Sequence, residues 1–219
     1  MAIFLEKIHD FDRQQTYYKH EVITMELNKI VELIFCGILA IMALLHIYKR
    51  NWKQLKAALL VIMLSLLPYC LHSLFQIKVD TFSSILYYGI LFMTLYLGSA
   101  CHYYDKYSWW DRLVHFLSGV SFVGFGIALA LLCSGIHRFG ILLFSYTFSI
   151  TLHAFWEVME YATDCRTHGN AQRWQKRHDS NNHVSEKAIQ PAGLVDTMND
   201  LICCMSGAAL AVVVWWFLL

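Results

Sequence analysis

Six long apolar runs constrain the fold of this chain more than any other feature of its sequence. They cover about residues 30–48, 57–75, 81–101, 111–133, 139–164 and 195–219. Each run is close to the roughly 20 residues that a helix needs to cross a bilayer. A helix also satisfies its own backbone polar groups in the absence of water. The sequence therefore predicts an all-α, polytopic membrane protein with a six-helix transmembrane bundle.

The overall composition agrees with this fold class. Of the 219 residues, 58% are hydrophobic and only 15% are charged, which is more apolar than a soluble domain of this size. The net charge of +1 gives no reason to expect a nucleic-acid partner. The seven cysteines include no C-x-x-C pair, so we interpret them as small hydrophobic residues in the bundle.

The charged segments define the expected domain organisation. Residues 1–28 are mixed and charged, and we interpret them as an interfacial amphipathic segment ahead of a transmembrane domain at 29–219. A polar link at 165–193 is the longest connection between spans. Connections on one side carry eleven of the 17 lysines and arginines, so we expect that side to be cytoplasmic and both termini to lie outside.

Acidic and histidine side chains recur at helical spacing in the last three apolar runs. The eight residues are Asp111, His115, His153, Glu157, Glu160, Asp164, Asp196 and Asp200. Spacings of three and four residues place each set on one face of its helix. All three sets lie at the ends predicted to face the cytoplasm. Ionisable groups at membrane depth are unfavourable and are typical of functional sites.

Carboxylates that lie close together repel one another unless protons or cations neutralise them. We therefore predict a divalent metal ion, zinc, manganese, iron or magnesium, in a pocket between these helices. The predicted ligands are His115, His153, Glu157, Asp196 and Asp200. The predicted general base or orienting group is Glu160 or Asp111, and Thr197 and Asn199 are expected to hydrogen-bond to ligands. The spacing leaves open whether one or two ions bind.

Structural roles are the alternative for several of these residues. Asp111 and Asp196 could each cap the start of a helix, and His153 with Glu157 could form a buried hydrogen-bonded pair. Gly119 and Gly207 are expected to permit close helix packing.

The arginines of the long link have two interpretations as well. Arg166, Arg173 and Arg177 could belong to a solvated connection, or to a lid that binds an anionic head group.

Three blocks of sequence resemble the YjdF-like family of bacterial inner-membrane proteins. They are YDK at 104–106 with DRLVHF at 111–116, FWEVME at 155–160, and DTMND at 196–200 with the later Gly207-Ala208. The resemblance covers about the last 120 residues and implies a site in a multi-pass protein of the bacterial cytoplasmic (inner) membrane, without naming a substrate. The link before the third block is longer, more basic and richer in histidine than in that family. The D-x-x-x-H block at 111–115 is also similar to the start of VanZ-like membrane proteins.

These features favour a metal-dependent membrane enzyme. Our leading hypothesis is a hydrolase that acts at the cytoplasmic interface on a membrane lipid or a lipid-linked ester or phosphate. One alternative is a proton- or cation-coupled transporter, because intramembrane acids and histidines also form relays. Another is a non-catalytic binding or resistance protein. The oligomeric state stays open.

Overall fold

The structure is a bundle of long helices whose lengths match a bilayer. The computed structural model describes residues 26–133, 135–167 and 192–219, which contain no strand. Six helical segments are long and apolar enough to span a membrane: Glu26–Tyr48, Trp52–Phe75, Thr81–Ala100, Trp110–Ala130, Arg138–Thr167 and Gly193–Leu218. The protein is thus an all-α, multi-pass membrane protein, as the apolar runs predict. The interfacial segment expected at 1–28 lies almost wholly outside the described residues.

Two of the six spans are not regular α-helices along their whole length. The second span divides into α2 (Trp52–Ser65) and α3 (Leu67–Phe75), with Pro68 in the first turn of α3. Proline lacks an N–H and clashes with the preceding turn, which breaks the helical ladder at this position. The third span continues from α4 (Thr81–Leu91) into the π-helix η1 (Phe92–Ala100). The six apolar runs by themselves predict neither interruption.

Local signals begin and end these helices. The side chain of Asn51 accepts a hydrogen bond from the Gln54 N–H at the start of α2. The carboxylate of Asp80 accepts one from the Ser83 N–H at 2.9 Å at the start of α4. Such caps satisfy donors that the first helical turn leaves unpaired. The links before α2 and α4 are short, so each of these spans lies antiparallel to the span before it.

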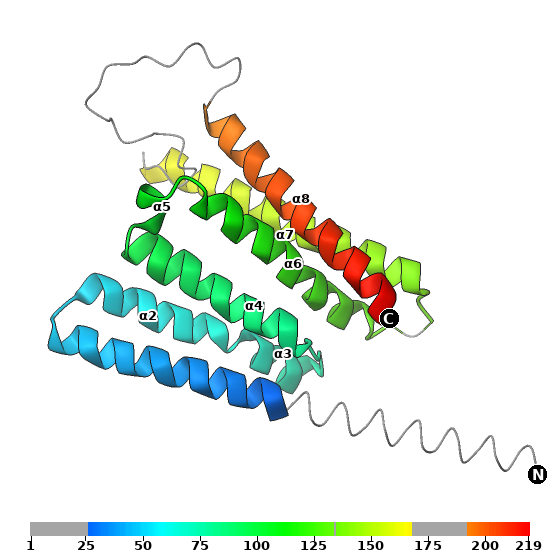
Figure 1. The fold of residues 1–219 in the computed structure, drawn as a ribbon, viewed down its shortest axis with the longest axis horizontal. Helices are drawn as coiled ribbons and strands as arrows, with labels where there is room; N and C mark the ends of the chain where they lie inside the picture. The colour runs from blue at the N-terminus through cyan, green and yellow to red at the C-terminus, as the bar shows by residue number, and fades with distance from the viewer. Residues whose placement is uncertain (1–25, 134, 168–191) are drawn as a thin grey trace, which may run out of the picture.

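The helix α6 (Trp110–Ala130) lies at the centre of the bundle (Figure 1). It packs against α8 (Ala192–Leu218), α7 (Arg138–Thr167) and α4, and the short α5 (Tyr103–Lys106) leads into it. About two thirds of the apolar window of α6 is buried, whereas no other span exceeds 39%. The first helix and α2 form the outer layer beyond α4 (Figure 1). Polar residues on α6 are therefore shielded from lipid by neighbouring helices.

Two glycines set the close approach of α6 and α8. A Cβ atom on Gly119 would meet the carbonyl oxygen of Cys204, and a Cβ on Gly207 would meet the carbonyl oxygen of Phe116. Only glycine allows two helix backbones to touch in this way. The expectation of close packing at both glycines is confirmed. Their contact brings the first turns of α6 beside the first half of α8.

Helix boundaries differ from the sequence prediction near the long link. The helix α7 continues through Thr167 and α8 already begins at Ala192, so both ends of the predicted 165–193 link are helical. Asp111 lies inside the first turn of α6, whose cap position is Trp109. Asp196 lies in the second turn of α8. The suggestion that these two aspartates cap their helices is therefore wrong.

Candidate metal centre

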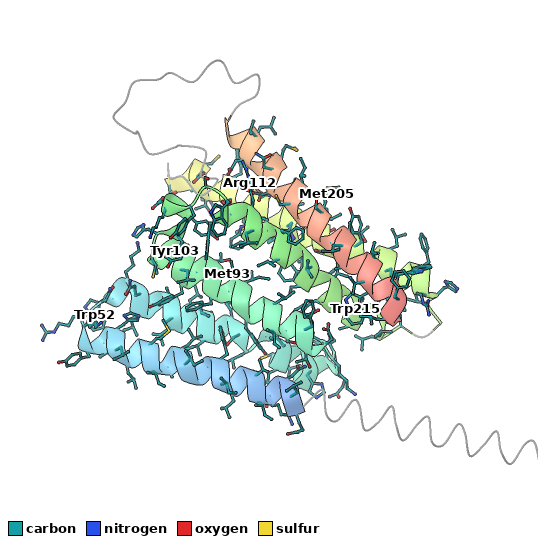
Figure 2. The ribbon with its side chains drawn as sticks, in the orientation of Figure 1. Trp52, Met93, Tyr103, Arg112, Met205 and Trp215 are labelled. Carbon is teal, nitrogen blue, oxygen red and sulfur yellow. The ribbon has the colours of Figure 1, made fainter. Side chains whose placement is uncertain are left out.

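The acidic and histidine residues gather at one end of the bundle, where α6 and α8 begin and α7 ends. Trp52, Tyr103 and Arg112 lie at this end and Trp215 lies at the other (Figure 2). The cytoplasmic side predicted from the lysine and arginine counts corresponds to this same end. The three helices therefore deliver their ionisable side chains to one depth, as the sequence spacing predicts.

The imidazole of His115 lies among three carboxylates, one from each of the three helices. Its Nε2 atom is 3.6 Å from Asp111 Oδ1, 3.9 Å from Glu157 Oε1 and 3.9 Å from Asp200 Oδ2. An N–H···O hydrogen bond is shorter, typically 2.7–3.2 Å. The three carboxylates thus surround this nitrogen at distances longer than a hydrogen bond.

Three of these residues form a group that could hold a metal ion. One ligand atom from each of Asp111, His115 and Asp200 lies within 4.8 Å of the other two. The side chains of His115 and Asp200 are 7% and 4% exposed, whereas that of Asp111 is 21% exposed. The group is therefore enclosed by protein, and Asp111 stands on its more open side.

Glu157 adds a carboxylate from α7. Its side chain is 6% exposed, and its Oε1 atom is buried without a hydrogen-bond partner among the described residues. The hydroxyl of Thr197 donates a hydrogen bond to the same carboxylate. A buried oxygen atom without a partner is unfavourable, so its position beside His115 needs a physical explanation.

Two further carboxylates extend the negative charge. Asp196 and Glu160 lie near enough to Asp200 to repel its charge, together with Asp111 and Glu157. Both are partly exposed, and Glu160 accepts a hydrogen bond of 2.8 Å from the indole N–H of Trp156. The described residues therefore place three carboxylates around one buried imidazole and two more near Asp200, with Glu160 at the rim.

His153 lies beside this group but uses its ring nitrogens elsewhere. Its Nε2 atom is 2.6 Å from the Ser118 hydroxyl, and its Nδ1 atom donates to the Ser149 carbonyl oxygen at 2.9 Å. The ring centroids of His153 and His115 are 5.6 Å apart. The predicted pair of His153 with Glu157 is not seen as a direct hydrogen bond. In this arrangement His153 connects α7 to α6 through Ser118, next to His115.

Ser118 has no place in the sequence prediction. Its hydroxyl lies 3.0 Å from the carbonyl oxygen of His115 and contacts His153 as well. Its spacing of three residues from His115 puts it on the same helix face, which was the available signal. A single serine in an apolar helix is too common for that spacing to be decisive.

The predicted anion-binding arginines are only partly described. Arg166 is exposed in the last turn of α7, outside the enclosed group. Arg173 and Arg177 lie outside the described residues. Asp164 is partly buried near the end of α7, one turn beyond Glu160.

The donor set fits a divalent cation. Two ligands bound about 2.1 Å from a tetrahedral ion lie about 3.4 Å apart, and the spacings around His115 are slightly longer. Small side-chain rotations would bring Asp111, His115 and Asp200 onto one ion, whereas Glu157 is not part of the group whose ligand atoms all lie within 4.8 Å of one another. One imidazole with several carboxylates suits zinc, manganese or iron, whereas magnesium would take the carboxylates and waters. The Oε1 atom of Glu157, which has no hydrogen-bond partner among the described residues, would gain a favourable contact with such an ion.

The fold and this group define the class: a multi-pass helical membrane protein with a buried acid–histidine centre at one end of its bundle. The chain belongs to the family described as "Predicted membrane protein (DUF2238)", which matches residues 30–219. This is the YjdF-like family that the three sequence blocks resemble. The more distant likeness to VanZ-like proteins gains no support. No curated protein and no solved structure matches the chain.

Proposed function

We propose that this protein is a metal-dependent membrane hydrolase whose substrate is a lipid or a lipid-linked ester or phosphate. The single observation that carries the proposal is the convergence of Asp111, Glu157 and Asp200 on the Nε2 atom of His115 inside the bundle. A divalent ion is the simplest group that can neutralise such a cluster without protonating it. A bound ion of this kind lowers the pKa of water and polarises an ester or phosphoryl oxygen.

The protein residues have separate tasks in this proposal. Asp111, His115, Glu157 and Asp200 hold the ion, and the Thr197 hydroxyl orients the Glu157 carboxylate. Asp111 was a candidate base in the sequence, but its place in the ligand group leaves Glu160 as the proton acceptor. Glu160 is at the partly exposed rim, where a carboxylate can exchange protons with water. Asp196 adds negative charge near Asp200, and the predicted ligand His153 holds α7 against α6 through Ser118.

The position of the centre supports a substrate that reaches it from the membrane surface. The centre lies within the first turns of α6 and α8, and its more open side is at Asp111. Lipid head groups occupy this depth, and their ester and phosphate groups carry oxygens that a cation binds. Arg166, Arg173 and Arg177 are proposed to bind the anionic part of the substrate.

A turnover assay tests the proposal. The protein is reconstituted in vesicles of bacterial polar lipids with zinc, manganese, iron or magnesium, and released phosphate and fatty acid are measured by mass spectrometry. Glu160→Gln should retain metal and lose turnover by about 100-fold or more, the contribution of a general base. Glu32→Gln, a matched change on the first helix, should leave turnover unchanged. Metal-loaded wild type that releases neither product would contradict the hydrolase proposal.

Buried hydroxyls favour proton- or cation-coupled transport as a second candidate. Ser118, Ser121, Ser145 and Ser149 are all buried on α6 and α7, and the Ser121 hydroxyl bonds to the Ser83 carbonyl oxygen at 2.9 Å on α4. These groups extend from the centre toward the other end of the bundle. Their hydrogen bonds to backbone carbonyls stabilise helix packing equally well. Accumulation of ⁶⁵Zn or protons inside sealed vesicles, with no lipid product, would favour transport.

A further inference from the structure

A second site lies at the same end of the bundle but on the opposite layer, between α2 and η1. An open groove of about 200 Å³ is lined by Lys53, Ala57, Leu60, Leu95, Ser99 and Ala100. Its walls are apolar apart from Ser99, and Lys53 stands at its end. None of these residues belongs to the candidate metal centre. We infer that this groove binds one anionic phospholipid, with its phosphate at Lys53 and an acyl chain between α2 and η1.

The lysine at the groove is held in place. Its Nζ atom is 2.9 Å from His102 Nε2, and His102 Nδ1 is 3.0 Å from Asp105 Oδ2. Lys53 can only donate, so the Nδ1 proton of His102 is directed to Asp105 in this chain of contacts. An ammonium group has three donors, and two remain for a phosphate oxygen. The side chain of Lys53 is thus oriented before a ligand arrives.

Backbone geometry beside the groove supports a binding role. His102 has φ of 61°, a left-handed conformation that is unfavourable for residues other than glycine. It lies two residues after Ala100, the last residue of the π-helix η1, and π-helical turns are frequent at functional sites. Together they place the His102 ring against Lys53. Strain of this kind persists where surrounding contacts impose it, and here it orients the cation at the groove.

The positive charge around the groove and its depth in the span indicate which ligand it binds. Lys49, Arg50 and Lys56 lie within four residues of Lys53 at the same end, so this corner is strongly basic. Basic pockets between helices on the cytoplasmic side suit anionic lipid head groups. Ala57, Leu60 and Leu95 continue from Lys53 into the span, where an acyl chain lies. A free phosphate would leave this apolar part uncovered, so we assign the groove to a lipid.

Native mass spectrometry of the full-length protein in detergent tests the assignment, with phosphatidylglycerol and phosphatidylcholine as probes. Wild type should retain one phosphatidylglycerol in preference to phosphatidylcholine. Lys53→Ala should weaken this binding about fivefold, the factor that one lysine contributes near an anionic surface. The matched variant Lys29→Ala, near the start of the first helix and outside this basic corner, keeps the groove intact and should bind like wild type. Equal weakening by both variants would show general surface attraction and overturn the proposal.

Two further experiments distinguish the contribution of the apolar groove from that of the Lys53 charge. Ala57→Phe fills the groove and leaves Lys53 in place, so the retained lipid should be lost; Leu59→Phe, on the exposed face of α2, should keep it. Glycerol 3-phosphate, which has the head group without acyl chains, should not displace the lipid. Displacement by glycerol 3-phosphate, or binding by Ala57→Phe at the wild-type level, would contradict a lipid in the groove. Unchanged melting temperatures in phosphatidylcholine would establish that the variants are folded.

Discussion

Single residues of the candidate metal centre act mainly through charge. His115 can neutralise at most one of the carboxylates around it, and only when it is protonated. Asp200 is the most enclosed of these acids, and it faces Asp111, Asp196, Glu157 and Glu160. Repulsion among them would destabilise the bundle, and the proposed cation would relieve it. Neutralising one carboxylate should therefore lower the metal content and should not lower the stability of the metal-free protein.

Asp200→Asn tests this link. The amide keeps the shape of the side chain and removes its charge, so metal content should fall from about one ion per chain to less than one tenth. The metal-free variant should melt at or above the temperature of metal-free wild type, because one repelling charge is gone. Metal is measured by inductively coupled plasma mass spectrometry. The control Asp164→Asn, at the end of α7, should keep wild-type metal; equal losses in both variants would contradict a specific centre.

The two histidines should differ in their effect on metal binding. His115→Gln removes the central nitrogen and should abolish binding. His153→Gln breaks contacts to Ser118 and Ser149 that hold α6 to α7, and it should weaken the affinity roughly 10- to 100-fold, as loss of a supporting partner does. Competition with a fluorescent chelator measures both constants. Equal abolition in both variants would make His153 a direct ligand instead.

At the scale of secondary structure, helix packing decides which residues meet. The spacing of acids and histidines could predict which residues share a helix face, and the glycines could predict close contact. Spacing could not predict that His153 would bond to Ser118, because that depends on how α7 is rotated against α6. The π-helix η1 was equally unpredictable, since the shift of its hydrogen bonds arises from packing rather than from any residue in Phe92–Ala100.

Gly207→Ala tests the contact between α6 and α8. The added methyl group would collide with the carbonyl oxygen of Phe116, so the helices must separate and move Asp200 away from His115. We expect the free energy of unfolding to fall by about 1–3 kcal/mol and metal affinity to fall with it. Gly89→Ala is the matched control, because its methyl group would meet no atom within 4 Å. Unfolding in a denaturant series measures the difference, and similar values for both variants would contradict this account.

At the scale of the whole molecule, hydropathy alone was enough to predict six spans, because the bilayer accepts few other solutions. Their ends were less predictable. The helix α8 begins at Ala192, three residues before the predicted run, and α7 continues through Thr167, three residues beyond its run. The orientation in the membrane rests only on the lysine and arginine counts and calls for its own experiment.

Two exposed cysteines at opposite ends of the bundle can report that orientation. Cys133 follows α6 and Cys165 lies near the end of α7. In variants that keep only one of them, a membrane-impermeant maleimide should label Cys133 in intact spheroplasts and Cys165 only after lysis. The reverse pattern would place the candidate metal centre and the basic groove on the outer face.

Unequal exposure around the centre has a kinetic consequence. His115, Glu157 and Asp200 are closed off by α6, α7 and α8, whereas about one fifth of the Asp111 side chain reaches the surface. An incoming ion would have to lose its hydration shell against this single carboxylate before meeting the others. Entry and release should therefore be slow, with residence times governed by the rotation of Asp111 rather than by the strength of the interior ligands.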